Sequence, residues 1–177
     1  GPEFQCPIYP GTRSTVTVDA NRVYALSGIG LLSAFDLDSG DKRWSRNILK
    51  DFNGPLITYG LAESPLMYRN TVICTPGGLD GEVVALDRES GKTVWTSTGT
   101  NDAAGYGSPL IVNYRGKDLL LATLHHFLIG IDPVNGRQFW RYTEPFSSGR
   151  ICLTPIISRE HQGIFLMGGE MCGGGAI

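Results

Sequence analysis

Long apolar stretches are missing from this chain of 177 residues, and none approaches the 18 consecutive apolar residues that a membrane-spanning helix needs. The sequence therefore predicts no membrane span. Positive charge is not concentrated either, because the formal net charge is −2 and the lysines and arginines form no basic stripe. This balance argues against nucleic acid as a partner.

Cysteine is sparse, and its spacing excludes two kinds of site. The four cysteines are Cys6, Cys74, Cys152 and Cys172. Metal knuckles and redox pairs need cysteines only a few residues apart, and these four are isolated from one another. We expect free thiols or one incidental disulfide, and a structural disulfide would require an oxidising compartment.

Signatures of common enzymes are also missing. No Gly-x-Ser-x-Gly nucleophile elbow occurs in the sequence. The glycine-rich run Gly168–Gly175 is followed neither by a helical pattern nor by the Lys-Ser/Thr pair of a phosphate loop. We therefore expect a flexible loop between strands there, and Gly28-Ile29-Gly30 is an equally weak dinucleotide signal.

What the chain does contain is one phrase written three times: an aspartate, a glycine four residues later and a tryptophan four residues after that. The three copies consist of Asp36, Gly40 and Trp44; Asp87, Gly91 and Trp95; and Asp132, Gly136 and Trp140. The tryptophans are 51 and 45 residues apart. Self-similarity at this period is typical of propellers and solenoids.

Other segments repeat in step with this phrase. A pair that begins with serine or threonine, which we call the lead-in pair, stands ahead of each unit: Ser14-Thr15, Ser64-Pro65, Ser108-Pro109 and Thr154-Pro155. Short strand-like runs bounded by turn residues follow. These runs are Arg22–Leu26, Leu31–Phe35, Thr71–Thr75, Glu82–Leu86, Asp118–Leu124, Phe127–Ile131 and Gly163–Met167. No amphipathic helical period lies between them, so we expect four strands in each unit.

The repeated aspartate and glycine have a physical explanation in a tight turn. The aspartate side chain accepts hydrogen bonds from backbone N–H groups two or three residues further on, and the glycine supplies the positive φ that ends the hairpin. The carboxylate pairs Asp36/Asp38 and Asp87/Glu89 recur with this turn. We therefore assign them a structural role and not acid–base catalysis.

Consecutive apolar residues, as in Val83–Leu86 and Leu119–Ala122, indicate sheets that are covered on both faces. Small sheets packed around an axis give that burial, and a recurrent tryptophan fits between neighbouring sheets if its N–H finds a partner. The sequence thus predicts an all-β fold, a β-propeller fragment of about three and a half four-stranded antiparallel blades.

The expected partial propeller covers residues 5–177, and Gly1–Phe4 is interpreted as a cloning remnant. The blades are expected at about 14–45, 64–96 and 108–142, with an incomplete one at 154–177. Propellers close with about four to eight blades, so we interpret the chain as a fragment of a longer protein. Exposed sheet edges invite pairing, and we expect self-association of two half-propellers into one ring, or association with the rest of the propeller.

The segment Ala85–Trp95, which reads Ala-Leu-Asp-x-x-Ser-Gly-Lys-x-x-Trp, resembles the tryptophan-docking repeat of PQQ-like propellers. These are the quinoprotein alcohol dehydrogenase-like proteins. Flanking stretches resemble a bacterial branch with PQQ-binding-like repeat proteins and polyvinyl-alcohol dehydrogenase-like proteins: Tyr9–Ser14, Lys50–Pro65, Val72–Gly78 and Ala104–Pro109. The resemblance covers about residues 7–177.

The resemblance implies a bacterial protein of the periplasm or cell envelope and leaves two functions open. The first hypothesis is a binding or scaffold module for a protein or polymer ligand, as in the outer-membrane assembly propeller of this superfamily. The alternative is a PQQ-dependent alcohol (polyvinyl-alcohol-like) dehydrogenase that oxidises a hydroxyl substrate at the propeller channel. A shared fold alone does not choose between them.

Two features of the quinoprotein enzymes are not found in this sequence. It has no vicinal cysteine pair, and the glutamate, asparagine and aspartate that surround their calcium ion map onto no set of residues here. No cofactor site is therefore readable in this chain, and no metal ligand or catalytic residue is assigned. PQQ with calcium is implied by the resemblance alone.

Candidate ligand-binding residues lie just before the lead-in pairs, because these segments recur around the channel axis. They are Arg13, Glu63, Tyr106 and Arg150. We expect them to bind an anionic or hydroxylated ligand, since arginine can fork onto a carboxylate or phosphate. The alternative is that they solvate the channel mouth and pair with one another.

Two further features bear on function. His125 and His126 are adjacent, and neighbouring strand residues point to opposite faces, so we expect turn or surface histidines and no shared metal unless a turn intervenes. The connection from Trp44 to Ser64 is the longest between repeats and includes Asp51–Pro55 and Tyr59–Glu63. Long loops on a rigid scaffold are common binding sites.

Overall fold

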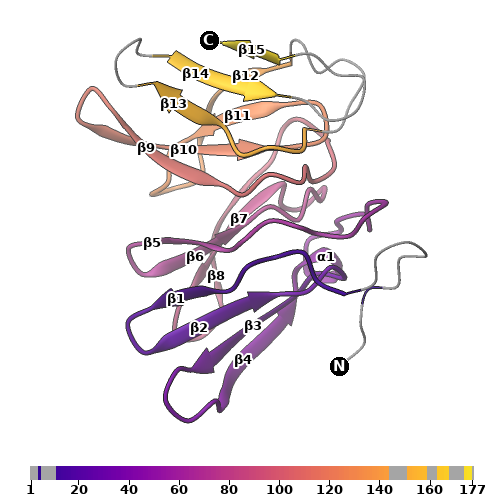
Figure 1. Ribbon diagram of the computed structural model, residues 1–177, viewed down its shortest axis with the longest axis vertical. Coiled ribbons are helices and arrows are strands. Elements are labelled where there is room, and N and C mark those ends of the chain that lie inside the picture. The colour runs from indigo at the N-terminus through magenta and orange to yellow at the C-terminus, as the bar shows by residue number, and fades with distance from the viewer. Residues whose placement is uncertain (1–3, 5–10, 144–150, 159–162, 168–173, 177) are drawn as a thin grey trace.

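The computed structural model describes residues 4, 11–143, 151–158, 163–167 and 174–176. In this part of the chain the strands form four antiparallel sheets, which we number blades 1 to 4 in chain order (Figure 1). Blade 1 holds β1 (Thr17–Asp19), β2 (Arg22–Leu26), β3 (Leu31–Asp36) and β4 (Lys42–Asn47). Blade 2 holds β5 (Leu66–Tyr68), β6 (Thr71–Cys74), β7 (Val83–Asp87) and β8 (Thr93–Ser97). Blade 3 holds β9 (Leu110–Tyr114), β10 (Lys117–Thr123), β11 (Leu128–Ile131) and β12 (Gln138–Tyr142). Blade 4 holds β13 (Ile156–Ser158), β14 (Gly163–Met167) and β15 (Gly174–Ala176).

Every blade is a meander in which each strand pairs with the next one along the chain. Figure 1 shows the blades stacked from blade 1 at the bottom to blade 4 at the top. The two-residue turns β1–β2, β5–β6 and β9–β10 lie on the left, at what we call the hairpin end. The segment that links blades 1 and 2 lies on the right, at the connection end, where antiparallel pairing also brings the β2–β3, β6–β7 and β10–β11 loops.

One turn of α-helix, α1 (Ile48–Asp51), follows blade 1 and was not predicted from the sequence. Its four residues are too few to show a helical period. The Asn47 side chain caps it by accepting the Lys50 N–H at 3.0 Å, while Ile48 and Leu49 are buried. No helix among the described residues is long and apolar enough to cross a membrane.

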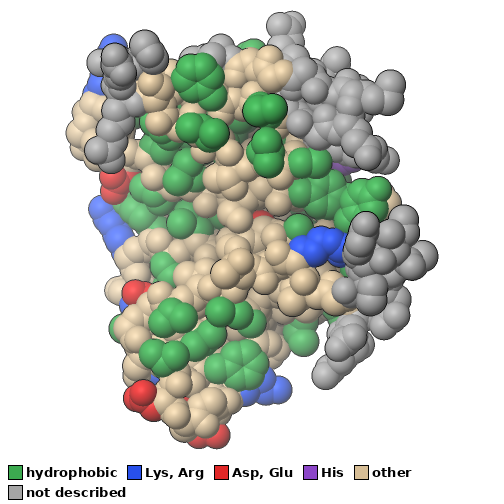
Figure 2. Space-filling view, in the orientation of Figure 1, with side chains coloured by type: hydrophobic (Ala, Val, Ile, Leu, Met, Phe, Trp, Pro, Cys, Tyr) green, Lys and Arg blue, Asp and Glu red, His purple; other side chains and the backbone are tan. Residues whose placement is uncertain are grey.

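The last blade leaves part of its apolar surface uncovered. Along β14, Leu166 is buried, whereas Phe165 and Met167 on the other face are 43% and 59% exposed. Ile156 on β13 is 66% exposed. Figure 2 shows hydrophobic side chains gathered over these strands at the top of the view.

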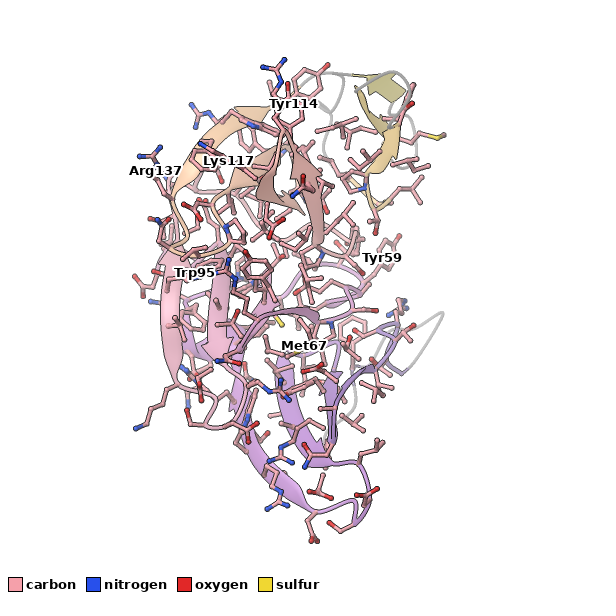
Figure 3. The ribbon with its side chains drawn as sticks, turned by 90° about the vertical axis from the view of Figure 1, so that its left-hand side faces the viewer. Tyr59, Met67, Trp95, Tyr114, Lys117 and Arg137 are labelled. Carbon is pink, nitrogen blue, oxygen red and sulfur yellow. The ribbon has the colours of Figure 1, made fainter. Side chains whose placement is uncertain are left out.

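The repeated tryptophans join neighbouring blades. The indole N–H of Trp44 donates to the carbonyl of Arg88 at 3.0 Å, and that of Trp95 donates to the carbonyl of Pro133 at 3.2 Å. Arg88 and Pro133 each follow the aspartate of the next repeat. The prediction that tryptophan packs between sheets is confirmed for these two, and Figure 3 shows Trp95 between blades 2 and 3.

Small residues make room for the indoles within each sheet. Across the strand pair, Ala34 lies opposite Trp44, Ala85 lies opposite Trp95, and Gly130 lies opposite Trp140. The register shifts at this same place in each of the three blades. A bulge increases local twist, so the fourth strand turns toward the next blade.

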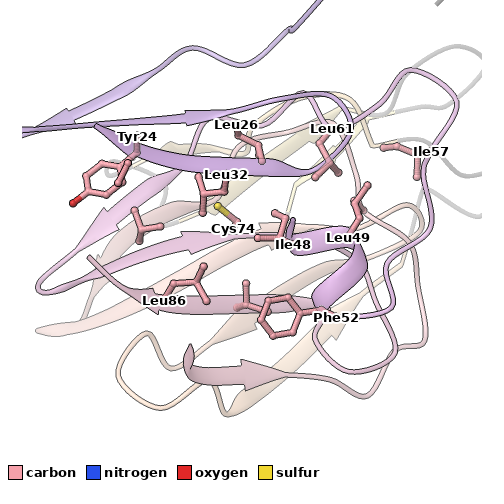
Figure 4. Close-up of a cluster of buried hydrophobic side chains, with 14 residues drawn as sticks. Tyr24, Leu26, Leu32, Ile48, Leu49, Phe52, Ile57, Leu61, Cys74 and Leu86 are labelled. Atoms are coloured by element: carbon pink, nitrogen blue, oxygen red, sulfur yellow. The ribbon is translucent and has the colours of Figure 1, made fainter. Parts of the chain in front are cut away.

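Three buried clusters fill the interfaces between consecutive blades. Val84 and Leu86 of β7 belong to the cluster shared with blade 1, which Figure 4 shows around Tyr24, Leu32 and Phe52. Val83 and Ala85 belong to the cluster shared with blade 3. The prediction from consecutive apolar residues is therefore confirmed, because one strand contributes alternate side chains to two cores.

The lead-in pairs also connect the blades. The Thr15 N–H donates to the Ser64 hydroxyl at 3.1 Å, and the Ser64 N–H donates to the Ser108 hydroxyl at 2.9 Å. The Ser108 N–H in turn donates to the Thr154 hydroxyl at 3.1 Å. This chain of hydrogen bonds aligns the first strand of all four blades and fixes which loops meet at the connection end.

Candidate functional site

The connection end brings two of the predicted ligand-binding residues together through a third residue. The Arg13 guanidinium donates to the Tyr59 carbonyl at 2.7 Å. The ring centroids of Tyr59 and Tyr106 are 5.8 Å apart with the planes tilted by 50°. Tyr59 is 37% exposed, whereas Arg13 and Tyr106 are partly buried. The result is a partly exposed surface of one cation and two phenols, which we call the tyrosine patch.

Glu63 differs from these residues because its side chain is buried. It is 2% exposed, and one carboxylate oxygen accepts the Thr75 N–H at 2.6 Å. The other oxygen is buried without a hydrogen-bond partner among the described residues. Burial raises the pKa of Glu63 to about 7, against the hydrogen bonds from Thr75, which lower it. A role for Glu63 in ligand binding stays a prediction, and Arg150 lies outside the described residues.

A cleft of about 790 Å³ opens at the same end between the loops of neighbouring blades. Lys50 and Asn101 line it beside Asp102. Two leucines of this cleft, Leu56 and Leu79, are 57% and 68% exposed. The cleft therefore offers apolar contact with a few polar groups, which is the usual character of a ligand site.

Asp102 holds the adjacent histidine loop in place. Its carboxylate accepts the His126 backbone N–H at 2.6 Å and lies 2.9 Å from Nδ1 of the same residue. A turn does intervene at this loop, so the His125 and His126 rings lie side by side with centroids 4.5 Å apart. Sequence reasoning missed Asp102 because 24 residues separate it from His126, and no local pattern links them.

The described side chains offer no cluster of donors for a bound metal ion. Among the described residues, no three histidine, cysteine or acidic side chains gather where they could hold a metal ion. Glu63 and Asp102 each already accept backbone N–H groups. Cys74 is a buried free thiol, and burial raises its pKa well above the usual range. These residues do not fit a calcium–quinone site, so no chemical step is derived through one.

Comparison with known proteins finds curated relatives and, separately, solved structures of similar fold. The quinoprotein ethanol dehydrogenase of Pseudomonas aeruginosa is 30% identical over 157 residues, which is 80% of this chain and 24% of that protein. The chain thus spans about a quarter of the length of the curated relatives it matches. Among solved structures, BamB from Moraxella catarrhalis aligns with a TM-score of 0.66 at 20% identity, covering 92% of this chain and 44% of that one.

A second solved structure has the same fold. The quinohemoprotein alcohol dehydrogenase from Comamonas testosteroni aligns with a TM-score of 0.62 at 18% identity, covering 88% of this chain and 29% of that one. With the four stacked meanders, these alignments confirm a partial β-propeller. The family described as outer membrane protein assembly factor BamB matches residues 7–168. This chain therefore belongs to the PQQ_2 family of PQQ-like repeat propellers.

Proposed function

We propose that this chain is the part of a bacterial envelope propeller that binds a protein or polymer partner at its connection end. The tyrosine patch carries the proposal, because two tyrosines beside an arginine form the composition that dominates binding energy at protein interfaces. The hydrogen bond from Arg13 to the Tyr59 carbonyl and the tilted contact with the Tyr106 ring restrict Tyr59 before any partner arrives, which lowers the entropic cost of binding.

In the same proposal, the Trp44 and Trp95 contacts are tryptophan-docking interactions. They fix each blade against the next, and the lead-in hydrogen bonds fix the first strands. The tyrosine patch is then built on a rigid frame, although its residues belong to loops. Loops held by a rigid scaffold are where binding residues concentrate.

Site-specific photo-cross-linking in the native host tests this proposal. A photoreactive amino acid replaces Tyr59 in one variant and Leu37, a 46% exposed residue of the β3–β4 turn of blade 1, in a control. We expect one defined cross-linked product at position 59 that is absent at position 37. Equal products at both positions, or none at position 59, overturn the proposal.

A second function, alcohol oxidation with PQQ, is favoured by the likeness to the quinoprotein ethanol dehydrogenase. The cofactor would supply the redox chemistry, and no residue of this chain is assigned to a step of it. PQQ and calcium are titrated into the longest form of the protein while absorbance and alcohol-dependent dye reduction are followed. Saturable binding with turnover supports this second function, and the lack of both eliminates it.

We also propose that a second copy of this chain covers the exposed face of blade 4. The argument is continuity, since each of the three blade interfaces buries an apolar cluster and this face carries the same kind of side chains. Light scattering at increasing concentration should show a dimer, and replacing Phe165 and Met167 with serine should give a monomer. A wild-type chain that stays monomeric contradicts the proposal.

A further inference from the structure

A cleft of about 1010 Å³ lies at the hairpin end of blades 2 and 3, whereas the tyrosine patch lies at the connection end. Four cationic residues line it: Arg69, Arg115, Lys117 and Arg137. All four are exposed. Figure 3 views this end and labels Lys117 and Arg137 beside Tyr114.

The four cations of this cleft outnumber its two carboxylates, Asp118 and Asp132. Among the described residues, no ion pair joins any of the four cations to a carboxylate, whereas Arg22, Arg43, Arg46 and Arg88 all form ion pairs. These four lie in blades 1 and 2 and not in the cleft. The cleft therefore has a net positive charge, which attracts an anionic ligand.

The two acidic side chains of the cleft are occupied by hydrogen bonds. Asp118 accepts from the Tyr68 hydroxyl and from the Asn113 side-chain amide, each at 3.1 Å. Asp132 accepts the Val134 N–H at 2.9 Å. Both carboxylates therefore hold the local framework together, and their two negative charges leave the four cations in excess.

Aromatic rings support three of the four cations. The guanidinium carbon lies 5.1 Å from a ring centroid in each of the three pairs: Arg69 with Tyr68, Arg115 with Tyr114, and Arg137 with Phe139. At this distance a guanidinium is attracted to the ring face. The pairing restricts the long side chains and keeps their N–H groups available to an incoming carboxylate.

Two of these arginines occupy positions that the backbone disfavours. Arg69 and Arg115 are the first residues of two-residue hairpin turns, with φ of +53° and +51°. Glycine and asparagine tolerate this left-handed region best, and other residues are strained there. Ala20 holds the same turn position in blade 1 with φ of +52°, so the strain belongs to the turn, and of blades 1 to 3 only blades 2 and 3 carry an arginine at that position.

We propose that this cleft binds an acidic peptide segment of a partner protein that also carries apolar side chains. Carboxylates would meet the arginine forks, and the apolar side chains would contact Val134, Phe139 and Tyr114, which are 54%, 48% and 49% exposed. A concave cleft does not fit a flat lipid surface. The net charge of −2 for the chain disfavours nucleic acid.

The test measures fluorescence anisotropy of a labelled peptide rich in glutamate and leucine, titrated with the 177-residue chain. The double variant Arg69→Asn/Arg115→Asn removes two charges and places asparagine where φ is positive. We expect the peptide affinity to fall about tenfold or more, since charge-assisted hydrogen bonds are lost. We also expect the double variant to unfold at an equal or higher urea concentration, which excludes misfolding as the cause.

The matched control is Ala20→Asn, at the equivalent turn of blade 1, where φ is +52° and the cleft does not reach. It should leave peptide affinity unchanged. Unchanged affinity in the double variant, or equal loss in the control, overturns the proposal. So does arginine-dependent binding of phosphatidylserine vesicles or duplex DNA in place of the peptide. Because the tyrosine patch is not altered, this result is independent of the cross-linking result.

Discussion

The first two blade interfaces share one contact and differ in what surrounds it. In both, an indole N–H donates to the backbone carbonyl of the residue that follows the aspartate of the next repeat. Trp44 donates to Arg88, and Trp95 donates to Pro133. Around Trp44 the charged side chains pair with one another, as in Arg22 with Glu89 at 2.8 Å and Arg88 with Asp19 at 2.7 Å. Around Trp95 the neighbouring Arg137 faces an open cleft.

This contrast shows that each repeat has two separate requirements, one for the packing between blades and one for the charged side chains at the rim of the interface. Packing between blades admits little variation, since the indole needs a carbonyl partner and packs against the turn glycine of the next repeat, Gly91 for Trp44 and Gly136 for Trp95. Charge at the rim of the interface is less constrained, because an ion pair with an exposed partner, such as Glu89 at 55% side-chain exposure, adds little stability. A function that needs unpaired arginines can therefore occupy one interface without weakening the fold.

The largest effect is expected at the tryptophan that is more deeply buried. Trp95→Ala should lower the free energy of unfolding by about 3–5 kcal/mol, because Trp95 is only 8% exposed. Trp44→Ala should cost less, since Trp44 is only partly buried and its removal opens a smaller cavity. Urea denaturation of both variants measures the difference, and equal losses would mean that the two interfaces contribute alike.

The next prediction concerns Glu63, which stands just before the lead-in residue Ser64 of blade 2. The matching residue of blade 3, just before Ser108, is Gly107, so only one of the two interfaces carries this carboxyl group. The folded state keeps the Glu63 proton up to pH about 7, whereas an unfolded chain loses it near 4.5. The free energy of unfolding should therefore fall as pH rises from about 4.5 through 7. Glu63→Gln should remove that slope and stabilise the protein at pH 8 by on the order of 3 kcal/mol. Chemical denaturation across pH measures both, and an unchanged slope in the variant refutes the assignment.

Glycine at the docking turn gives a smaller and well-controlled comparison. Gly136 has φ of +77°, and a Cβ there would lie 2.6 Å from Cε3 of Trp95. Gly40 has φ of +74°, and a Cβ there would meet nothing within 4 Å. Both alanine variants carry the left-handed backbone cost of about 1–2 kcal/mol, and Gly136→Ala adds about 1–3 kcal/mol of overpacking. Thermal unfolding that ranks the two equally would contradict the role of the interface.

The smallest effect concerns the turn of blade 1. The hydrogen bond from Arg43, with backbone N–H groups such as that of Ser39, lowers the pKa of Asp36 to about 2. The stabilisation this provides is present above the unfolded pKa near 3.8 and is lost as pH falls through about 2. Arg43→Gln should move acid unfolding to a slightly higher pH, followed by circular dichroism. The same midpoint in both proteins would leave Arg43 without this role.

Much of the fold follows from short patterns along the chain. The turn at Asp87–Gly91 could be predicted because its hydrogen bonds span only a few residues, and both faces of Val83–Leu86 could be predicted because every position is apolar. The helix α1 could not be predicted because a single turn is too short to show a helical periodicity in the sequence. The sequence also could not indicate that Glu63 would be buried, since its surroundings come from another strand.

Sequence alone determined the repeat, its strands, its turns and the need of each tryptophan for a polar partner. These properties depend on backbone geometry and on neighbours within about ten residues. Tertiary structure alone decided that Arg13 and Tyr106 meet through Tyr59, and that four cations in one cleft have no ion-pair partner among the residues that the structure describes. The reason is that blades stack through contacts between residues roughly a repeat apart, and only the stacked arrangement sets which charges find a counter-charge.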